Sequence, residues 1–231
     1  MKTRLLNKVQ LVLETVSRYG SLTINELAEK FNIPLPTMSR LISDMAEMKL
    51  VEKIDYYRVV PASGLIRLGE SARKHSYLVQ QISPILERHA EKVQMNVLLA
   101  GFDEDIMFPL YHRGAAEESS SMIWKSGLAL VLMAQAKLSP EVCRELFVEN
   151  MPEISDTELM ILNRELESVQ RDRLLFRSNT MRNWSCSYGF KYHKLDCGFC
   201  FYGQAPDYSR ERFILDCSRV LSRITAIFKA E

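Results

Sequence analysis

Residues 22–48, LTINELAEKFNIPLPTMSRLISDMAEM, predict two short helices joined by a tight turn. Thr23 and Glu26 have the spacing of a capping box, in which a hydroxyl and a carboxylate satisfy backbone N–H groups at the start of a helix. The segment Asn32-Ile33-Pro34 ends the first helix, because proline restricts the residue before it and cannot continue a helical ladder. Pro36 suits the first turn of the next helix. Two helices joined so closely form a helix-turn-helix, whose second helix can lie in the major groove of DNA.

The second predicted helix has a small, polar outer face. At about 100° per residue, its apolar residues fall together on one side, and they are Met38, Leu41, Ile42 and Met45. The opposite side carries Pro36, Ser39, Arg40, Ser43 and Glu47, with Thr37 at its N-terminal flank. Arginine can read guanine through two hydrogen bonds, and serine or threonine can contact bases or phosphates. An ordinary amphipathic helix with a solvated outer face explains the pattern equally well, so the flanking sequence decides between the two interpretations.

The flanking sequence favours DNA binding. Residues 50–54 and 57–60 predict two strands of a hairpin around Asp55-Tyr56. An N-terminal helix that ends near Gly20 is predicted by apolar residues at 3/4 spacing, and these are Leu5, Val9, Val12 and Val16. Three helices and a hairpin make a winged helix-turn-helix, in which the wing contacts phosphates. The candidate DNA-binding residues are therefore Pro36, Thr37, Ser39, Arg40, Ser43, Lys53, Tyr57 and Arg58.

Charge is unevenly distributed along the 231 residues. Residues 1–75 contain twelve Lys and Arg and eight Asp and Glu, a net charge of +4, whereas the rest contains eighteen against twenty-one, a net charge of −3. The hydrophobic fraction of 47% is enough for two domains with their own cores. A basic N-terminal part and an acidic C-terminal part suit a DNA-contacting domain joined to a domain of another kind.

Neither a secretory signal nor a membrane span is expected. The apolar residues of segment 1–20 are spaced as in an amphipathic helix, and no apolar run approaches the roughly 20 residues that a membrane helix needs. The five cysteines are an odd number, which argues against a disulfide framework. We therefore expect a cytoplasmic, reduced protein.

Residues 95–231 predict an α+β domain with a mainly antiparallel sheet. Strands are expected at 95–100, 107–111, 174–177, 184–192 and 198–203, and helices at 122–136, from Pro140, from Ser155 to about Arg171, and at 209–228. Ahead of this domain, Ser83-Pro84 resembles the start of a new helix, so a helix break is expected there.

Several short motifs identify a family resemblance. Residues 22–28 read L-x-x-x-E-L-A, residues 33–40 read I-P-L-P-T-x-x-R, and residues 50–52 read L-V-E. These motifs resemble the N-terminal domain of IclR-family bacterial transcription regulators, well over residues 5 to 60 and more faintly to the C-terminus. The resemblance implies a DNA-binding domain at 1–68, a linker helix at 69–83 and a GAF-like effector-binding domain at 84–231. It also implies a dimer or tetramer, with Leu65, Leu68, Tyr77 and Leu78 as candidates for the dimer contact.

The resemblance also implies an effector site over the sheet. The family has a G-x-A motif at the start of a helix, which Gly127-Leu128-Ala129 fits, and a late strand that ends in glycine, which residues 199–203 fit. The candidate effector-binding residues are Gly127, Ala129, Trp184, Cys200 and Tyr202. A small organic acid is the family's usual effector, whereas the aromatic residues here favour a more apolar, aromatic molecule.

Two other functions remain open in the sequence. Cys197 and Cys200 form a C-x-x-C, and with Cys186 and His193 nearby they could sense a metal or a change in redox state. In a strand, however, the two cysteines would point to opposite faces, which opposes chelation. The other alternative is a protein-interaction module whose winged helix does not bind DNA.

Enzyme motifs are missing from the sequence. It contains no G-x-S-x-G, P-loop, H-E-x-x-H or dinucleotide-binding glycine run. We expect no catalytic residues, no metal site and no cofactor. The predicted function is a two-domain transcription regulator that binds a pseudo-palindromic operator in double-stranded DNA as a dimer or tetramer, with its affinity modulated by a small effector.

Overall fold

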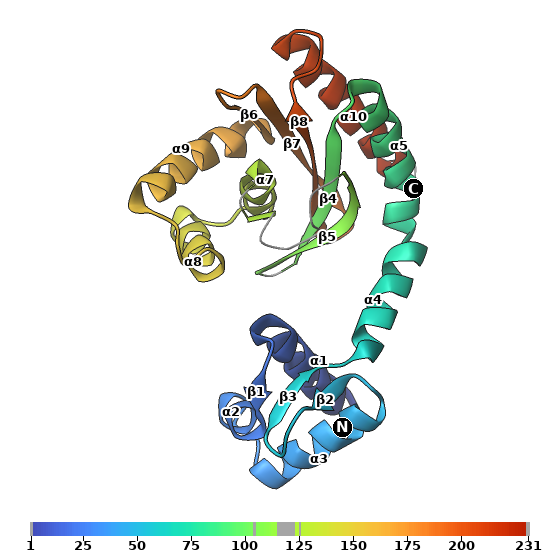
Figure 1. Cartoon of the computed structure of the whole chain (residues 1–231), viewed down its shortest axis with the longest axis vertical. Helices are drawn as coiled ribbons and strands as arrows, with labels where there is room; N and C mark the ends of the chain where they lie inside the picture. Colours follow the sequence, from blue (N-terminus) through green and yellow to red (C-terminus); the bar gives the residue numbers. More distant parts are fainter. Residues whose placement is uncertain (1, 104, 115–122, 125, 230–231) are drawn as a thin grey trace. The chain divides into compact units, whose positions relative to one another are not determined.

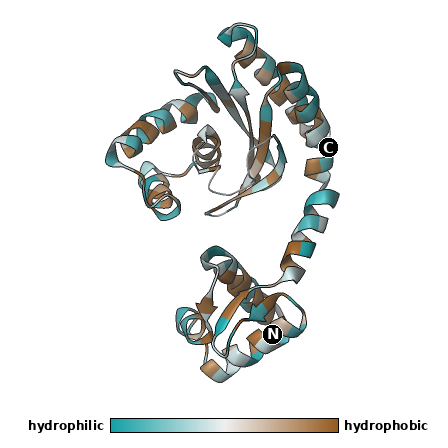
Figure 2. Ribbon diagram, in the orientation of Figure 1, coloured by the Kyte–Doolittle hydropathy of each residue, from teal (hydrophilic) through white to brown (hydrophobic). Residues whose placement is uncertain are grey.

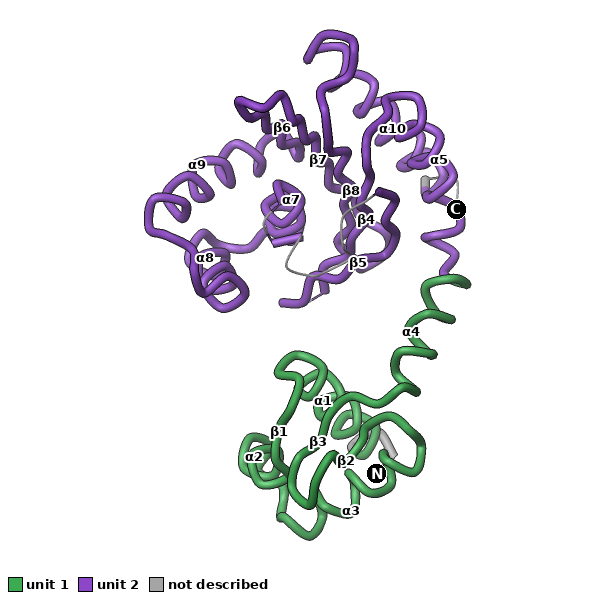
Figure 3. The backbone as a smooth tube through the Cα atoms, in the orientation of Figure 1, with its two compact units in different colours: residues 1–75 green, residues 76–231 purple. Residues whose placement is uncertain are grey.

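The chain divides into two compact units, Met1–His75 and Ser76–Glu231, in a computed structural model (Figure 3). The structure describes all residues except 1, 104, 115–122, 125 and 230–231. The division falls inside the segment 69–83 that was predicted as a linker helix. None of the described helices has a stretch long and apolar enough to cross a membrane.

Unit 1 is a helical domain with a small antiparallel sheet of order β1-β3-β2 (Figure 1). Its elements are α1 (Lys2–Tyr19), β1 (Leu22–Thr23), α2 (Ile24–Lys30), α3 (Leu35–Glu47), β2 (Val51–Lys53), β3 (Arg58–Pro61) and α4 (Ser63–His75). The predicted capping box is present, because Thr23 Oγ1 accepts from Glu26 N at 3.1 Å and Glu26 Oε2 accepts from Thr23 N at 2.7 Å. The winged helix-turn-helix predicted from the sequence is confirmed.

The residues predicted from helix periodicity to face the core of unit 1 do so, with one exception. All four apolar residues assigned to the inner face of α3 are buried, and they are Met38, Leu41, Ile42 and Met45. On α1, Val12 and Val16 are buried, but Leu5 is 57% exposed, so its assignment to the buried stripe was wrong. The physical reason is that α1 extends beyond the small core of this unit, which ends near Val9.

Unit 2 is an α+β domain built on a five-stranded sheet of order β5-β4-β8-β7-β6. Every neighbouring pair of strands is antiparallel, which confirms the predicted sheet. The helices are α5 (Tyr77–Val93), α7 (Gly127–Gln135), α8 (Pro140–Asn150), α9 (Asp156–Asp172) and α10 (Arg210–Lys229). The strands are β4 (Asn96–Asp103), β5 (Ile106–Arg113), β6 (Leu174–Ser178), β7 (Asn183–Tyr192) and β8 (Leu195–Gln204).

Helices cover both faces of this sheet and give it two separate cores. On one side α7 packs against β7 and β8, and α9 packs against α7; on the other side α5 and α10 lie side by side (Figure 1). Side chains alternate along β8, so Cys200 joins the α7 core whereas Phe199 and Phe201 join the α5 and α10 core. A ligand site on one face is therefore separated from the other face by the thickness of the sheet.

Helix α7 is almost entirely apolar (Figure 2), and it packs closely on β7 and β8. Gly198 of β8 makes this approach possible, because a Cβ there would lie 2.8 Å from Leu128 Cδ1 and 2.9 Å from the Tyr188 carbonyl oxygen. Gly127 has the same role at the start of the helix, where a Cβ would lie 2.9 Å from Leu175 Cδ2. Within the helix predicted for 122–136, α7 begins at Gly127 with Ser126 as its N-cap, Ile123 and Trp124 before it are also helical, and Met122 lies outside the described residues.

The break predicted at Ser83-Pro84 was wrong. Helix α5 runs from Tyr77 through Pro84 to Val93, and the break lies at Ser76, its N-cap. An interior proline removes one helical hydrogen bond, but the apolar face of α5 is buried on both sides of it, which compensates for that loss. Leu78 belongs to this buried face and packs inside unit 2, so it is not available for a dimer contact.

Candidate DNA-binding surface and effector cavity

The outer face of α3 is accessible near its N-terminus. Pro36, Thr37 and Arg40 are exposed, and Ser39 is half-buried beside them. Pro34, the N-cap, makes no side-chain cap, and the first turn contains no acidic residue. The partial positive charge of this helix end therefore remains available for an anion such as a DNA phosphate. Asp44 and Glu47 place negative charge at the other end of α3, which restricts a polyanion to the N-terminal half.

Ser43 is already engaged within the protein. Its hydroxyl donates to the Ser39 carbonyl oxygen at 3.0 Å and accepts from Lys53 Nζ at 2.8 Å. The second bond joins α3 to β2 and holds the Lys53 ammonium group beside the helix. The structure therefore brings two of the predicted site residues together, with Ser43 supporting a cation rather than presenting a free hydroxyl.

The wing is a tight turn held by one carboxylate. Asp55 Oδ1 accepts from the backbone N–H groups of Tyr57 at 2.8 Å and Arg58 at 2.6 Å, and these bonds lower the pKa of Asp55. Tyr57 and Arg58 are exposed, as predicted for residues near the tip. Tyr56, at the very tip, is 92% exposed.

Two exposed residues of this surface were missed by the sequence reasoning. Tyr56 was considered only as part of the turn, and Leu35 was given no role of its own. Leu35 is the first residue of α3 and is 48% exposed.

Unit 2 contains a cavity of about 640 Å³ between the N-terminus of α7 and strands β4, β6, β7 and β8. Its polar lining residues include Asn96, Ser126, Arg177, Ser178, Asn179, Asn183 and Ser185. Gly127, Trp184, Cys200 and Tyr202, four of the five predicted effector-binding residues, also border it. Ser126 Oγ accepts from Leu128 N at 3.1 Å and donates to the Ile123 carbonyl oxygen at 2.7 Å, so it fixes the start of α7 at the cavity wall.

Ala129, the fifth predicted residue, does not line the cavity. It is completely buried in the α7 core, because the second residue after Gly127 turns away from the mouth of the cavity. Trp184 borders the cavity, but its ring packs away from it. Its ring contacts Phe176 and Phe213, with centroids 5.6 and 5.7 Å apart, in the core on the α10 side. Alternation along β7 leaves Ser185 facing the cavity.

Tyr202 supplies the aromatic surface of the cavity. Its hydroxyl lies 2.7 Å from His112 Nε2, and the two rings are stacked at a centroid distance of 6.4 Å. Burial raises the pKa of Tyr202 to about 12, so its phenol remains protonated at neutral pH. The hydroxyl can therefore exchange hydrogen bonds with both the imidazole and a ligand.

Arg177 is the one cationic side chain on the cavity wall, among the residues that the structure describes. Its Nε and Nη2 donate to the two carboxylate oxygens of Glu165 on α9, at 3.1 and 2.5 Å. This bidentate pair fixes the plane of the guanidinium group. Arg177 also borders a second cavity of about 400 Å³, which Trp124 and Leu162 help to line. The sequence reasoning missed Arg177, because nothing in the primary structure places β6 next to the start of α7.

The cysteines do not form a chelating or reactive group in this fold. Cys197 and Cys200 lie in the cores on opposite faces of the sheet, as the strand alternation predicted. Burial raises the pKa of each of these two thiols to about 12, which opposes thiolate formation. Among the described residues, no cluster of three His, Cys, Asp or Glu side chains has a metal-binding arrangement.

The two units place this chain in a class of two-domain proteins in which a winged helix-turn-helix is followed by an α+β domain with a ligand-sized cavity. Residues 6–55 match the family model described as the IclR helix-turn-helix domain. No curated protein matches the chain. Residues 6–55 are thus similar to the IclR helix-turn-helix domain, and the chain shares its fold with solved IclR-family structures over nearly its full length.

Solved structures of that fold cover almost the whole chain. An IclR family transcriptional regulator from Brucella abortus superimposes with a TM-score of 0.66 at 19% identity, covering 98% of this chain and 92% of that one. An IclR homolog from Microbacterium hydrocarbonoxydans, complexed with 4-hydroxybenzoate, has a TM-score of 0.58 at 20% identity, with coverages of 98% and 100%. An IclR transcriptional regulator from Alicyclobacillus acidocaldarius has a TM-score of 0.56 at 14% identity, with coverages of 97% and 98%. These neighbours are regulators rather than enzymes.

Proposed function

We propose that this protein is a transcription regulator whose unit 1 binds double-stranded DNA and whose unit 2 binds a small effector that changes the affinity for DNA. The observation that carries the DNA-binding part is the exposed N-terminal half of α3, with Thr37, Ser39 and Arg40 accessible and Lys53 held beside them. Unit 1 also has a net charge of +4, which favours a polyanionic partner.

The contacts on DNA follow from this geometry. Arg40 would contact a base edge in the major groove. Thr37 and the backbone N–H groups at the N-terminus of α3 would bind a phosphate, and Tyr57 and Arg58 of the wing would contact a neighbouring phosphate. If the protein acts as a dimer or a tetramer of dimers, two copies of α3 would read a pseudo-palindromic operator.

A selection experiment tests the DNA-binding part without knowledge of the operator. The full-length protein is incubated with a pool of random duplexes in about 0.15 M salt, and the bound DNA is sequenced over successive rounds. We expect enrichment of one inverted repeat. Recovery of DNA with no enriched sequence, or of none at all, would favour the alternative of a protein-interaction module.

The effector is proposed to be a small molecule with both an aromatic ring and an acidic group. Tyr202 supplies a ring to stack on, and Arg177 with Asn96, Asn179 and Asn183 supplies donors for oxygen atoms. The complex of the Microbacterium homolog with 4-hydroxybenzoate gives a first probe of that chemistry.

The effector part is tested by binding and by its effect on DNA. We expect 4-hydroxybenzoate, or a related aromatic acid from a small panel, to raise the melting temperature and to change the affinity for the selected duplex. Ser185→Leu should abolish this response by filling the cavity, whereas Tyr202→Phe should only weaken it. A response that persists in Ser185→Leu would place the effector elsewhere.

A further inference from the structure

A second concave site lies between α5 and α10, on the face of the sheet opposite the effector cavity. The two helices pack against each other, and the groove between them encloses about 330 Å³. Its polar residues are Arg88, His89 and Lys92 on α5 and Asp216, Arg219 and Arg223 on α10. These six residues define the α5–α10 groove. The volume has room for about ten water molecules, since each takes about 30 Å³ in the liquid.

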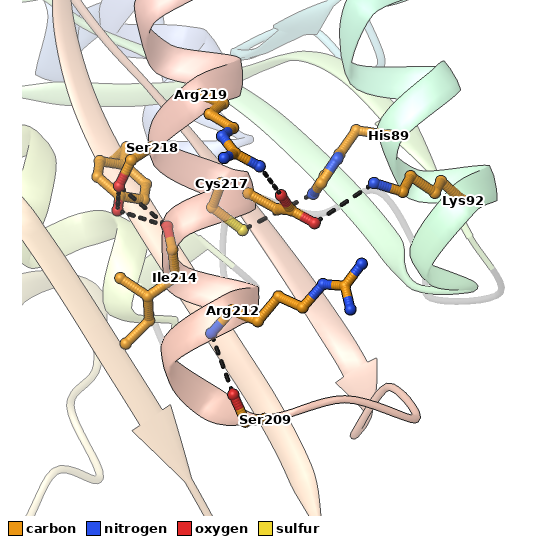
Figure 4. A network of polar contacts seen from close by, with 10 residues as sticks. His89, Lys92, Ser209, Arg212, Ile214, Cys217, Ser218 and Arg219 are labelled. Atoms are coloured by element: carbon orange, nitrogen blue, oxygen red, sulfur yellow. Dashed lines mark hydrogen bonds and ion pairs between the residues drawn. The ribbon is translucent and has the colours of Figure 1, made fainter.

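The spacing of the cations places them on facing walls. Arg88 and Lys92 are four residues apart on α5, and Arg219 and Arg223 are four residues apart on α10, so each pair shares one side of its helix. Figure 4 shows Lys92 reaching from α5 and Arg219 reaching from α10 toward the same point between the helices. Four positive charges thus converge in a unit whose net charge is negative, −3 over residues 76–231.

A single carboxylate neutralises only part of this charge. The Asp216 side chain is 7% exposed and accepts from Lys92 Nζ at 3.4 Å and from Arg219 Nη1 at 3.0 Å. Among the described residues, no hydrogen bond or ion pair joins Arg88 or Arg223 to another side chain. Two guanidinium groups therefore face the groove with all their donors available to a ligand.

His89 lines the α5–α10 groove between these charged residues. It is buried, with Nε2 3.9 Å from Cys217 Sγ. Burial is the main cause that lowers the pKa of His89 to about 4, and Lys92 and Arg223 lower it further, against the opposing effect of Asp216. The imidazole is neutral at neutral pH, so it adds no charge of its own but can exchange hydrogen bonds with a bound group.

We propose that the α5–α10 groove is a binding site for a compact anion that carries two or more negative charges on phosphate or carboxylate oxygens. The guanidinium groups of Arg88 and Arg223 would bind it from opposite walls, because planar donor forks match such oxygens. Lys92 and Arg219 stay on Asp216 and keep the floor of the groove in place. This site is separate from the proposed effector cavity and does not depend on it.

Calorimetry on the full-length protein tests this proposal with two probes, pyrophosphate and citrate, at pH 7.5 and constant ionic strength. A solvated charged surface would bind neither, whereas a built site should bind at least one with a dissociation constant below about 1 mM. Acetate and chloride are the monovalent controls. Pyrophosphate binding alone would identify a phosphate site, and citrate binding alone a polycarboxylate site.

Matched variants locate the binding. Arg88→Gln and Arg223→Gln should each weaken it by about tenfold, the size of one charge-assisted hydrogen bond. Arg164→Gln on α9 removes an equally exposed positive charge from the same unit and should leave the affinity unchanged. Asp216→Asn should tighten binding, because it removes the only negative charge in the groove. Lack of binding by both probes, or equal losses in Arg88→Gln and Arg164→Gln, would overturn the proposal.

A spectroscopic readout separates binding in the groove from binding elsewhere. An anion next to His89 should raise the pKa of that imidazole, which can be followed by its ring proton signals in an NMR titration with and without pyrophosphate. A His89 signal that titrates identically in both samples would contradict the proposed location.

Discussion

At the scale of single residues, Ser43 and Arg40 have different environments, although both lie on the outer face of α3. The Ser43 hydroxyl is bonded to the Ser39 carbonyl oxygen and to Lys53. Arg40 is exposed, and its guanidinium group makes no hydrogen bond or ion pair with the residues that the structure describes. Position on a helix face was predictable from the 3.6-residue period. The engagement of Ser43 was not, because its partner Lys53 belongs to a strand ten residues later.

This difference predicts two kinds of DNA-binding defect. Ser43→Ala should release Lys53 and weaken binding to specific and non-specific duplexes to the same modest extent, about threefold to tenfold. Arg40→Ala should weaken specific binding more than non-specific binding, because a base contact would be lost. Fluorescence anisotropy with the selected duplex and a scrambled one measures both. An equal specificity ratio for the two variants would exclude the proposed role of Arg40.

His89 predicts a dependence of stability on pH. Above pH 6.5 the imidazole is neutral in both the folded and the unfolded chain, so it contributes nothing to the pH dependence there. As the pH falls from 6.5 toward 4, His89 becomes protonated in the unfolded chain but stays neutral in the folded chain, because the pKa of folded His89 is about 4. Stability should therefore fall over this range. The difference in pKa corresponds to about 3 kcal/mol, which screening by water in the α5–α10 groove, whose wall includes His89, reduces to about 1–2 kcal/mol.

Urea unfolding at pH 7.5, 5.5 and 4.5 measures this loss. His89→Gln should lose less stability on acidification than the wild-type protein, whereas His193→Gln, at an exposed position, should follow the wild type. Identical pH profiles for all three proteins would show that the buried imidazole does not control the acid response.

At the scale of elements, helix ends were predictable and long-range neighbours were not. The capping residues Thr23, Ser139 and Ser155 lie at the predicted helix starts, because a cap is a local property of a few residues. The cavity wall combines Asn96 of β4 with Arg177 of β6, strands that lie on either side of β8 and β7. That arrangement depends on strand order, which local patterns do not encode. The break at Ser76 was missed because Pro84 gave the stronger local signal.

The close contact between α7 and the sheet can be tested at Gly198. Gly198→Ala should destabilise unit 2 by about 1–3 kcal/mol, because the added methyl group meets the Tyr188 carbonyl oxygen, which the sheet holds in place. Both tryptophans lie in unit 2, so their fluorescence reports its unfolding. Gly69→Ala in α4 meets no atom within 4 Å and should instead stabilise its helix by about 0.5–1 kcal/mol, followed by circular dichroism. A Gly198→Ala protein as stable as the wild type would contradict the tight packing.

At the scale of the whole molecule, the chain joins a winged helix-turn-helix unit to an α+β unit that contains a ligand-sized cavity. Residues 1–75, which carry a net charge of +4, coincide with unit 1, whereas the sequence prediction ended the DNA-binding domain at residue 68. The residues of a contact between copies of the chain were harder to predict from the sequence. Of the residues suggested for a dimer contact, Leu78 is buried in its own unit, whereas Leu68 and Tyr77 are 55% and 47% exposed. Ile66, which was not considered, is 69% exposed.

Exposed apolar residues on α4 predict a contact between copies of the chain. Ile66→Glu combined with Leu68→Glu should convert the predicted dimer into a monomer and lower the affinity for an inverted repeat, because two linked half-sites bind more tightly than one. Sedimentation equilibrium measures the mass. A wild-type protein that is already a monomer would refute the dimer prediction, and a variant that remains a dimer would place the contact elsewhere.

The central claim is that the N-terminal half of α3 binds DNA. Its most direct test is the affinity of the full-length protein for its selected duplex, measured between about 50 and 200 mM salt. The same measurement is made on Arg40→Ala and on the control Arg67→Ala, which removes an exposed charge from α4 of the same unit. We predict nanomolar binding that weakens steeply with salt, a loss of at least tenfold in Arg40→Ala and wild-type affinity in Arg67→Ala. Wild-type affinity in Arg40→Ala, or binding that does not respond to salt, would contradict the claim.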